Sequence, residues 1–283
     1  MTQVNIGLLH PGAMGISLGA TAVNSGQKVW WVSENRSSDT RDRAERRGLA
    51  DAGNLAKLCG ICDVIISCCP PHAARTVAES VVSCNFKGVY ADLNAISPQQ
   101  SIQIGERVNL AGVEFVDGGI IGGPAWEKGT TWLYLSGEKA DTIARCFNAG
   151  PLETQTMGVA IGKASALKMC YAAGTKGLTA LYCAIMAAAE NLGVRTELEA
   201  QWERDEKGSA DQVRTRVRRV TAKAWRFSGE MKEIASTFES AGVPGGFHLA
   251  AHEIYDRVAR FRGCEDLPDL EEVLKALAGG ENK

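Results

Sequence analysis

The sequence lacks the features of exported, membrane-spanning and nucleic-acid-binding proteins. Its N-terminus, MTQVNIGLLHPG, has no basic segment followed by a cleavable apolar run, so we expect no secretion signal. The longest apolar run near the middle, residues 178–189, has about twelve residues, too few to span a bilayer. The formal net charge is −2, which gives no general attraction to nucleic acid or to an anionic membrane. These absences predict a cytoplasmic protein with no membrane and no nucleic-acid partner.

Histidine is scarce, and the cysteines form no obvious framework. Of the four histidines, His248 and His252 have a metal-compatible spacing, but no third ligand is evident, so we predict no metal site. The nine cysteines are odd in number, and several fall inside expected strands or helices. We therefore expect reduced, buried thiols and no disulfides.

The first half of the sequence contains short apolar runs that alternate with helical patterns. Examples of the runs are VNIGLL at residues 4–9, KVWWV at 28–32 and DVIISCC at 63–69. This alternation predicts a parallel, doubly wound sheet. After about residue 158 the strand signals vanish, and helices are expected at residues 162–192, 196–206, 210–228, 229–240 and 247–261, with a short one after 269.

These patterns predict an α/β protein of two domains. The first, residues 1–157, is expected to be a Rossmann-type, doubly wound parallel sheet that binds NAD(P). The second, residues 158–283, is expected to be all-α, to begin with a long interdomain helix, and to serve substrate binding and dimerisation.

A glycine-rich turn follows the first expected strand. The segment HPGAMG stands where a strand passes into a helix, so its backbone N–H groups can approach a pyrophosphate at the helix N-terminus. It departs from the usual G-x-G-x-x-G because His10 occupies the first glycine position. The cofactor-binding residues predicted here are His10, Pro11, Gly12, Ala13, Met14 and Gly15.

The end of the second expected strand bears on the choice of cofactor. Arg36, with Ser33 and Ser37 nearby, resembles a cradle for the 2′-phosphate of NADP, since a guanidinium pairs bidentately with phosphate. Glu34 argues the other way, because an acidic residue here typically holds the ribose of NAD. We predict NADP, with NAD as the alternative. The further arginines at positions 41, 43, 46 and 47 are expected on a solvated helix face.

Several motifs occur together along the chain. They are Gly12-Ala-Met-Gly15, Asp117-Gly-Gly-Ile-Ile-Gly-Gly123, Gly129-Thr130, Gly162 with Lys168, and Lys232-Glu233-Ile234 followed by Ala241-Gly242-Val243-Pro244. In this combination the chain resembles the β-hydroxyacid dehydrogenase and 6-phosphogluconate dehydrogenase superfamily over essentially its whole length. In four places it departs from that pattern, because Ile121 replaces a substrate-binding serine, Gly119 a proline, Ala172 an asparagine and Ala164 a glycine. With these departures the chain is similar to a poorly characterised branch of the superfamily, whose helical domain is variant.

The resemblance implies that Lys168 is the catalytic residue. Its ammonium would donate a proton to a carbonyl oxygen as hydride arrives, and a neutral lysine would take the proton in the oxidative direction. On a helix, Lys168 shares a small, polar face with Thr175, which could replace part of the missing asparagine. Lys176 is expected to be exposed or to contact the other domain.

Further site residues come from strand ends and from the resemblance. The substrate-binding residues expected are Asn94, Gly119, Ile120, Ile121, Gly122, Gly123, Lys168, Ala172 and His248. The glycines at 122 and 123 could present backbone N–H groups to a substrate anion; the alternative is that the glycine-rich stretch is simply a turn after a strand. The additional cofactor-binding residues expected are Cys69, Pro70, Asn94 and Lys232.

The resulting hypothesis is an NADP-dependent oxidoreductase that moves hydride between nicotinamide and a small carbonyl or alcohol substrate. Two alternatives stay open. One is an imine reductase, which the apolar Ile121 and Ala172 favour and the retained Lys168 disfavours. The other is a non-catalytic dinucleotide-binding protein. The resemblance also implies a homodimer formed through the helical domain.

Overall fold

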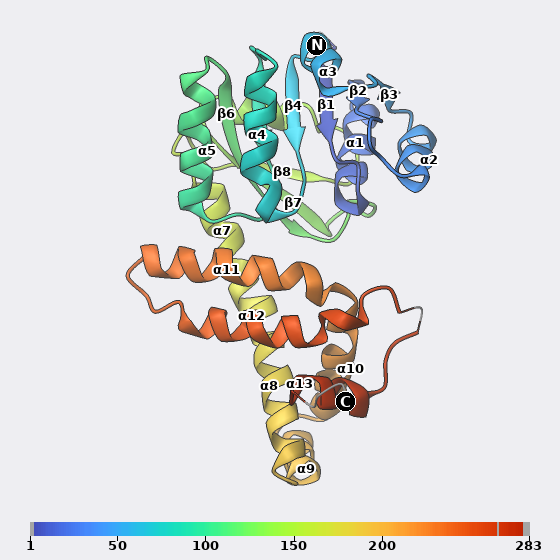
Figure 1. Cartoon of the computed structure of the whole chain (residues 1–283), viewed down its shortest axis with the longest axis vertical. Helices are drawn as coiled ribbons and strands as arrows, with labels where there is room; N and C mark the ends of the chain where they lie inside the picture. The colour runs from blue at the N-terminus through green and yellow to red at the C-terminus, as the bar shows by residue number, and fades with distance from the viewer. Residues whose placement is uncertain (1–2, 265, 280–283) are drawn as a thin grey trace. The chain divides into compact units, whose positions relative to one another are not determined.

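The chain forms two compact units, seen in a computed structural model that describes residues 3–264 and 266–279 (Figure 1). The first unit is Met1–Met169 and the second is Cys170–Lys283. The division therefore falls between residues 169 and 170, whereas the sequence analysis placed it between 157 and 158. The difference arises because the start of the long helix is held to the sheet by hydrogen bonds.

The first unit is built on one eight-stranded sheet with the order β3-β2-β1-β4-β5-β6-β7-β8. The strands are β1 Asn5–Leu9, β2 Lys28–Trp31, β3 Ala50–Asp51, β4 Val64–Ser67, β5 Val89–Asp92, β6 Glu114–Gly122, β7 Thr131–Ser136 and β8 Glu153–Thr156. The helices between them are α1 Ala13–Asn24, α2 Ser38–Arg46, α3 Leu55–Ile61, α4 Ala74–Ser83, α5 Pro98–Leu110 and α6 Ala140–Arg145. A short 3₁₀ turn, Pro71–Ala73, precedes α4. The predicted Rossmann-type doubly wound fold is confirmed.

One pair of neighbouring strands departs from the expected parallel arrangement. Strands β6 and β7 are antiparallel, with Asp117 opposite Ser136 and Gly122 opposite Thr131. The chain passes from one to the other through a short connection without a helix, and a short connection can join only antiparallel neighbours. The sheet is therefore mostly parallel.

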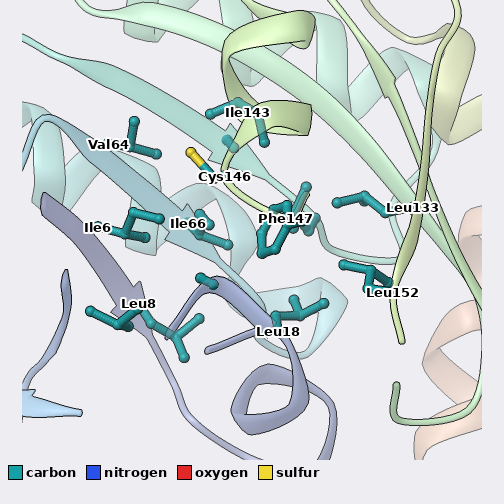
Figure 2. Packing of buried hydrophobic residues seen from close by; sticks show 14 of the residues in the cluster. Ile6, Leu8, Leu18, Val64, Ile66, Leu133, Ile143, Cys146, Phe147 and Leu152 are labelled. Atoms are coloured by element: carbon teal, nitrogen blue, oxygen red, sulfur yellow. The ribbon is translucent and has the colours of Figure 1, made fainter. Parts of the chain in front are cut away.

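Apolar residues cover both faces of the sheet because successive side chains of a strand point to opposite faces. Ile6 and Leu8 of β1 pack with residues of α1 and α6, including Leu18 and Ile143 (Figure 2). Leu9, on the other face, packs in a second cluster with residues of α3, α4 and α5. In Figure 1, α4 and α5 lie in front of the strands. Layers on both faces are the arrangement that a parallel sheet requires.

A buried carboxylate joins the middle of the sheet to the next helix, α7 (Lys163–Ala172). Asp117 of β6 is 1% exposed, and its two oxygens accept six hydrogen bonds. Three donors are backbone N–H groups at the start of α7, those of Gly162, Ala164 and Ser165, at 3.0–3.1 Å. The other three are the hydroxyls of Ser101, Ser136 and Ser165, at 2.5–2.9 Å.

Asp117 therefore acts as the N-terminal cap of α7, although it lies far from that helix in the sequence. The first N–H groups of a helix have no partner inside the helix, and a negative charge there also interacts favourably with the helix dipole. Because all six bonds come from protein groups, the carboxylate is stabilised in the core without solvent. The start of α7 is consequently held against β6.

The second unit consists of helices. They are the end of α7, α8 Leu178–Asn191, α9 Arg195–Asp205, α10 Ser209–Val220, α11 Ala224–Ser240, α12 Gly246–Val258 and α13 Leu270–Leu277, with a π-helical segment Ala173–Gly177 and 3₁₀ turns Thr221–Lys223 and Ala259–Phe261. The all-α prediction is confirmed. The predicted break between residues 228 and 229 is wrong, because α11 runs through Gly229 and the interruption lies at Thr221–Lys223. An added Cβ at position 229 would meet no atom within 4 Å, so this glycine is open surface inside a helix.

Helices α11 and α12 lie side by side (Figure 1), and a polar cluster links them. The Ser228 hydroxyl donates to Asp256 Oδ1 at 2.5 Å and lies 2.8 Å from His252 Nδ1. His252 Nε2 lies 3.2 Å from the other oxygen of Asp256. The predicted metal-compatible histidine pair therefore has a different arrangement, since His252 pairs with Asp256 while His248 is buried among aromatic rings. No group of residues suited to holding a metal ion occurs in the described parts of the chain.

The long helical stretch Lys163–Asn191 has 29 residues and is interrupted by the π-helical segment. Among the described helices it alone has the length and apolar composition to cross a membrane. Core helices of soluble proteins have the same property, so this feature does not decide between the two. The predicted absence of a membrane partner stays a prediction.

Asp92 is a second buried carboxyl of the sheet, directly opposite Asp117 on the neighbouring strand. Its Oδ1 accepts from the Asn94 N–H at 2.9 Å, while its Oδ2 has no partner among the described residues. Burial first, and then the negative charge of Asp117, raise the pKa of Asp92 from 3.8 to about 7. Asp92 therefore keeps its proton in the folded protein at a pH at which the unfolded chain has lost it.

We predict that Asp92→Asn makes the protein more stable than the wild type at pH 8 but not at pH 4. A raised acidic pKa means that unfolding releases a proton above pH 3.8, so the Asp92 contribution to folding weakens as pH rises towards 7, by on the order of 4 kcal/mol in total. Urea unfolding of both proteins from pH 4 to pH 8 measures this contribution as the difference between the two curves. Parallel curves would contradict the prediction.

Candidate functional site

The turn between β1 and α1 has the backbone of a phosphate-binding loop. His10 adopts a left-handed conformation with φ 69°, and its carbonyl accepts a hydrogen bond from the Gly12 N–H at 2.7 Å. An added Cβ at Gly15 would lie 2.5 Å from the His10 carbonyl oxygen, so only glycine lets α1 approach the turn this closely. At Gly12, in contrast, an added Cβ would lie no closer than 4.0 Å to another atom, so the space beside Gly12 is open.

The N-terminus of α1 is not capped by a side chain. Gly12 stands at the capping position, and the first turn contains no acidic residue. The first N–H groups of a helix are therefore free to bind an anion, which the helix dipole also favours. Pro11 and Met14 face the protein, since the Pro11 carbonyl accepts from Arg43 Nη1 at 3.2 Å and Met14 packs on the core.

The end of β2 brings the predicted 2′-phosphate residues together. Ser33 is buried, its carbonyl accepts from the Arg36 N–H at 3.2 Å, and Arg41 Nη2 donates to the same carbonyl at 3.0 Å. Ser37 caps α2, because its hydroxyl accepts from the Thr40 N–H at 3.4 Å. The Ser37 hydroxyl thus has a structural role as well as its predicted one.

Two buried nitrogen atoms at the ends of β1 and β2 have no partner among the described residues. They are His10 Nδ1 and Arg36 Nε. Burial and the positive charge of Arg36 lower the pKa of His10 to about 4, so the imidazole is neutral near pH 7. Unpartnered buried polar atoms are rare in folded proteins and usually have a ligand or water as partner. A glycine cradle, an uncapped helix and these two nitrogens fit the phosphates and ribose of a dinucleotide.

The predicted residues at the ends of β4 and β5 mainly bind one another. Asn94 is 2% exposed, and its side-chain oxygen accepts from the Cys69 N–H at 2.5 Å. Its amide nitrogen donates to the Ser67 hydroxyl at 3.1 Å. Burial is the largest factor that raises the pKa of the Cys69 thiol to about 11, so it stays protonated. Asn94 thus binds the backbone of Cys69, and the predicted ligand contacts of Asn94, Cys69 and Pro70 stay a prediction.

Most of the glycine-rich segment Asp117–Gly123 lies in a strand. Gly119, Ile120 and Ile121 lie within β6 and pair with β7, and Gly122 is the last paired residue. Gly122 has φ 117°, and an added Cβ would lie 2.1 Å from the Thr130 carbonyl oxygen. The alternative interpretation of this stretch as a turn is therefore wrong for Gly119 to Gly122, which pair with β7. Ile120 and Ile121 are buried.

Gly119 brings Lys168 against this strand. A Cβ at position 119 would lie 2.6 Å from the Ala164 carbonyl oxygen and 2.9 Å from Lys168 Cβ, so α7 touches the strand backbone here. Lys168 itself is half-buried. Asp117 and Gly119 lie two residues apart on β6, and both hold α7, the first through the cap and the second through close packing. Together they fix the stem of Lys168 over the glycine-rich strand.

The remaining predicted residues lie in the second unit. The Thr175 hydroxyl donates to the carbonyls of Tyr171 and Ala172, at 3.1 and 3.4 Å, inside its own helix. Ala172 is buried, and Lys232 is exposed. His248 is buried against the rings of Phe238 and Phe247, and burial lowers the pKa of His248.

The sequence analysis missed an ion pair at the π-helical segment Ala173–Gly177. Lys176 was expected to be exposed or at the other domain, but its side chain is 17% exposed and pairs with Glu230 of α11. Its ammonium lies 4.6 Å from the centre of the Phe227 ring, and its carbonyl accepts from the Tyr255 hydroxyl at 2.6 Å. No local pattern signals this arrangement, because the partners stand 54 and 79 positions further along the chain.

The comparisons with known proteins identify both halves of the chain. A sequence model of the NAD-binding domain of 6-phosphogluconate dehydrogenase matches residues 5–148, and a model of a domain of unknown function, DUF1932, matches residues 189–258. An uncharacterised 28.5 kDa protein of Methanothermus fervidus, encoded in the 7S RNA 5′ region, is 30% identical over 186 residues. That alignment covers 65% of this chain and 71% of the other.

Solved structures with the same fold extend over nearly the whole chain. The conserved protein MTH1747, of unknown function and structurally similar to 3-hydroxyacid dehydrogenases, is 25% identical, with a TM-score of 0.65. The match covers 92% of this chain and 100% of MTH1747, and coverage is given in the same order below. 3-Hydroxyisobutyrate dehydrogenase of Mycobacterium tuberculosis with L-serine is 16% identical, with a TM-score of 0.69 and coverage of 98% and 99%. The reductive aminase of Aspergillus terreus with NADPH and ethyl levulinate is 16% identical, with a TM-score of 0.54 and coverage of 97% and 99%.

The two structures at 16% identity show the fold alone, whereas the matched domain covers half of the chain and contains the whole dinucleotide turn. The chain therefore belongs to the 6-phosphogluconate dehydrogenase-like family of NAD(P)-dependent oxidoreductases.

Proposed function

We propose that the protein transfers hydride between NADP and a small carbonyl or alcohol substrate, with Lys168 as general acid and base. The observation that carries this proposal is the placement of Lys168 by two contacts, the Asp117 cap on α7 and the close packing of α7 on Gly119. A catalytic group must be held in a narrow range of positions, and buried contacts to a rigid strand do this better than a surface loop. An exposed helix lysine would need neither contact.

The chain's own residues account for binding and proton transfer. When bound, the dinucleotide supplies or accepts the hydride. The turn His10–Gly15 and the uncapped start of α1 would hold its phosphates, and neutral His10 adds a polar atom without adding charge. In reduction, the Lys168 ammonium donates a proton to the carbonyl oxygen, and in oxidation the neutral amine accepts the proton of the alcohol.

The residues predicted for the substrate favour a substrate with little polarity around its reacting carbon. Ile121 is 7% exposed and stands where relatives of this superfamily have a serine that binds substrate. A buried isoleucine offers no hydrogen bond to a carboxylate or hydroxyl. We infer that a simple hydroxy acid is a poorer substrate than an apolar aldehyde or ketone.

The same isoleucine supports imine reduction as a second candidate function, since an imine needs no hydroxyl-binding group. The test compares NADPH consumption with cyclic imines, aldehydes and ketones, and reduction of NADP⁺ with hydroxy acids, in parallel. Turnover of imines alone would favour the second candidate over the first. We further propose a homodimeric, cytoplasmic enzyme without a membrane, nucleic-acid or metal partner.

We predict that Lys168→Ala lowers kcat by roughly 10²–10⁴-fold, since that is the typical contribution of a positioned general acid or base. NADPH affinity, measured by fluorescence titration, should be almost unchanged. Lys163→Ala, at an exposed lysine of the same helix, is the matched control and should retain full activity. Wild-type kinetics in Lys168→Ala would show that the lysine takes no part in proton transfer. A protein that binds neither NADPH nor NADH would sink the proposal as a whole.

We predict that Gly119→Ala also lowers kcat while NADPH affinity persists. The added methyl group would overlap the Ala164 carbonyl and the Lys168 stem, so α7 must move away from β6. Gly60→Ala is the control, because an added Cβ there meets no atom within 4 Å. Steady-state kinetics and thermal melting separate a misplaced lysine from a general loss of folding. Equal kcat values for the two variants would contradict the positioning role of Gly119.

We predict that Arg36→Ala weakens NADPH binding at least tenfold and NADH binding by less than about threefold. A guanidinium interacts strongly with a phosphate but has no comparable partner on the unphosphorylated ribose. Arg145→Ala, at an exposed arginine of α6, is the control. Fluorescence titrations with both cofactors measure the two ratios. A wild type that prefers NADH, or an equal loss of both cofactors, would point to NAD instead.

A further inference from the structure

A cavity in the first unit lies beside the dinucleotide turn but involves other residues than the predicted 2′-phosphate cradle. Its volume is about 540 Å³, and its lining comes from α1, α2 and the segment after β6. The lining residues are Ala13, Ile16, Arg43, Arg46, Arg47, Pro124 and Trp126. The cavity shares Ala13 with the predicted dinucleotide turn, but neither Arg36 nor the serines beside it contribute, so it differs from the cradle at the end of β2.

The cavity carries a concentrated positive charge. Arg43, Arg46 and Arg47 follow the spacing i, i+3, i+4, which puts them on one face of α2 and its last turn. Across the described residues, none of the three forms an ion pair with a carboxylate. Like charges at this spacing destabilise a helix. The sequence analysis assigned these arginines to a solvated face; Arg46 and Arg47 are exposed and Arg43 is half-buried, and all three line the cavity.

The arginines are partly held in place by the protein. Arg43 Nη1 donates to the Pro11 carbonyl at 3.2 Å, and Arg46 Nε donates to the Asp42 carbonyl at 3.1 Å. The Arg47 guanidinium lies 4.5 Å from the centre of the Trp126 ring. These contacts reduce the entropy lost when the guanidinium groups bind a ligand.

Trp126 forms an aromatic wall of the cavity and is itself anchored. Trp126 is 45% exposed, so part of its side chain is accessible to a ligand. The preceding residue is fixed to α1, because the Ala125 N–H donates to the Ser17 hydroxyl at 2.9 Å. The wall can therefore contact an organic group while the arginines contact its charge.

We propose that this cavity is a second ligand site, which takes a small phosphorylated organic molecule in addition to the dinucleotide. Three guanidinium groups without carboxylate partners suit a dianionic phosphate better than a single carboxylate. The volume is within the range of small-molecule sites and exceeds what an inorganic ion needs. The proposal goes beyond the proposed function and does not depend on hydride transfer.

The test is calorimetric titration with inorganic pyrophosphate, with and without saturating NADPH. We expect one equivalent to bind when NADPH is saturating, and a second to bind at the dinucleotide turn when NADPH is absent; the affinities of the variants are therefore compared in saturating NADPH. Arg46→Ala and Arg47→Ala should each lower pyrophosphate affinity at least fivefold and leave NADPH affinity within twofold. Arg145→Ala should change neither. Thermal melting verifies that these variants of exposed arginines are folded.

Two results would overturn the proposal. In the first, the two arginine variants bind pyrophosphate as tightly as the wild type, so the anion binds elsewhere. In the second, saturating NADPH abolishes pyrophosphate binding, so the cavity is part of the dinucleotide site. A protein that binds no NADPH at all would contradict the proposed function instead, and the comparison of arginine variants would still be valid.

Phenyl phosphate tests the organic part of the ligand. Trp126→Ala should weaken phenyl phosphate binding at least fivefold and pyrophosphate binding by less than twofold, because only the former has a ring to contact the indole. Equal effects on the two probes would contradict an organic ligand and would leave an inorganic phosphate as the occupant.

Discussion

The bonding of Asp117 to the start of α7 is the constraint on which the candidate site depends. One buried carboxylate on β6 accepts hydrogen bonds from three backbone N–H groups and three hydroxyls, and these donors come from α5, β7 and the start of α7. Removing the carboxylate would leave those donors unsatisfied in the core, at a cost of roughly 1–3 kcal/mol for each unpaired group. This cap determines the position of Lys168, because the lysine lies on α7, the helix whose N-terminus Asp117 caps.

The glycines of β6 complete the constraint. A helix can lie against a strand at backbone distance only where the strand has no Cβ, and Gly119 is such a position. The glycine-rich motif is therefore explained here by packing, as well as by the substrate contact that the family resemblance implies. Ile121, two residues further along the strand, then gives the segment its apolar character.

The carboxyl ends of β1 and β2 show the complementary feature, polar groups without partners. His10 and Arg36 each have a buried nitrogen that no described residue satisfies, and α1 begins without a capping side chain. The neighbouring cavity adds three arginines without carboxylates. An unsatisfied buried nitrogen costs stability unless a ligand or water binds to it. The first unit thus has two adjacent regions suited to phosphate, and only one of them is explained by the dinucleotide.

Local patterns in the sequence were enough to predict the alternating α/β half, the dinucleotide turn and the helical half. These depend on residue periodicity and on glycine at a strand–helix junction, which act over a few residues. Lys168 also could be singled out, through motifs in frame with those of a known family. The antiparallel β7, the strand conformation of the glycine-rich segment and the continuous helix α11 could not be predicted, because pairing and packing overrode the local turn signals at Gly122 and Gly229.

The division of roles among charged residues was decided only by the tertiary structure. Asp117 and the start of α7 are separated by 45–48 positions in the sequence, yet they are joined by hydrogen bonds. Lys176 and Glu230 form an ion pair although 54 positions separate them. The sequence placed Arg43, Arg46 and Arg47 on one helix face, and the tertiary structure brings Trp126 near them, so that the four residues line one cavity. By itself the sequence determined which chemical groups are present and which helices and strands they occupy. Which groups meet was decided by the packing of helices on the sheet, because hydrogen bonds and charges act over a few ångströms and ignore distance along the chain.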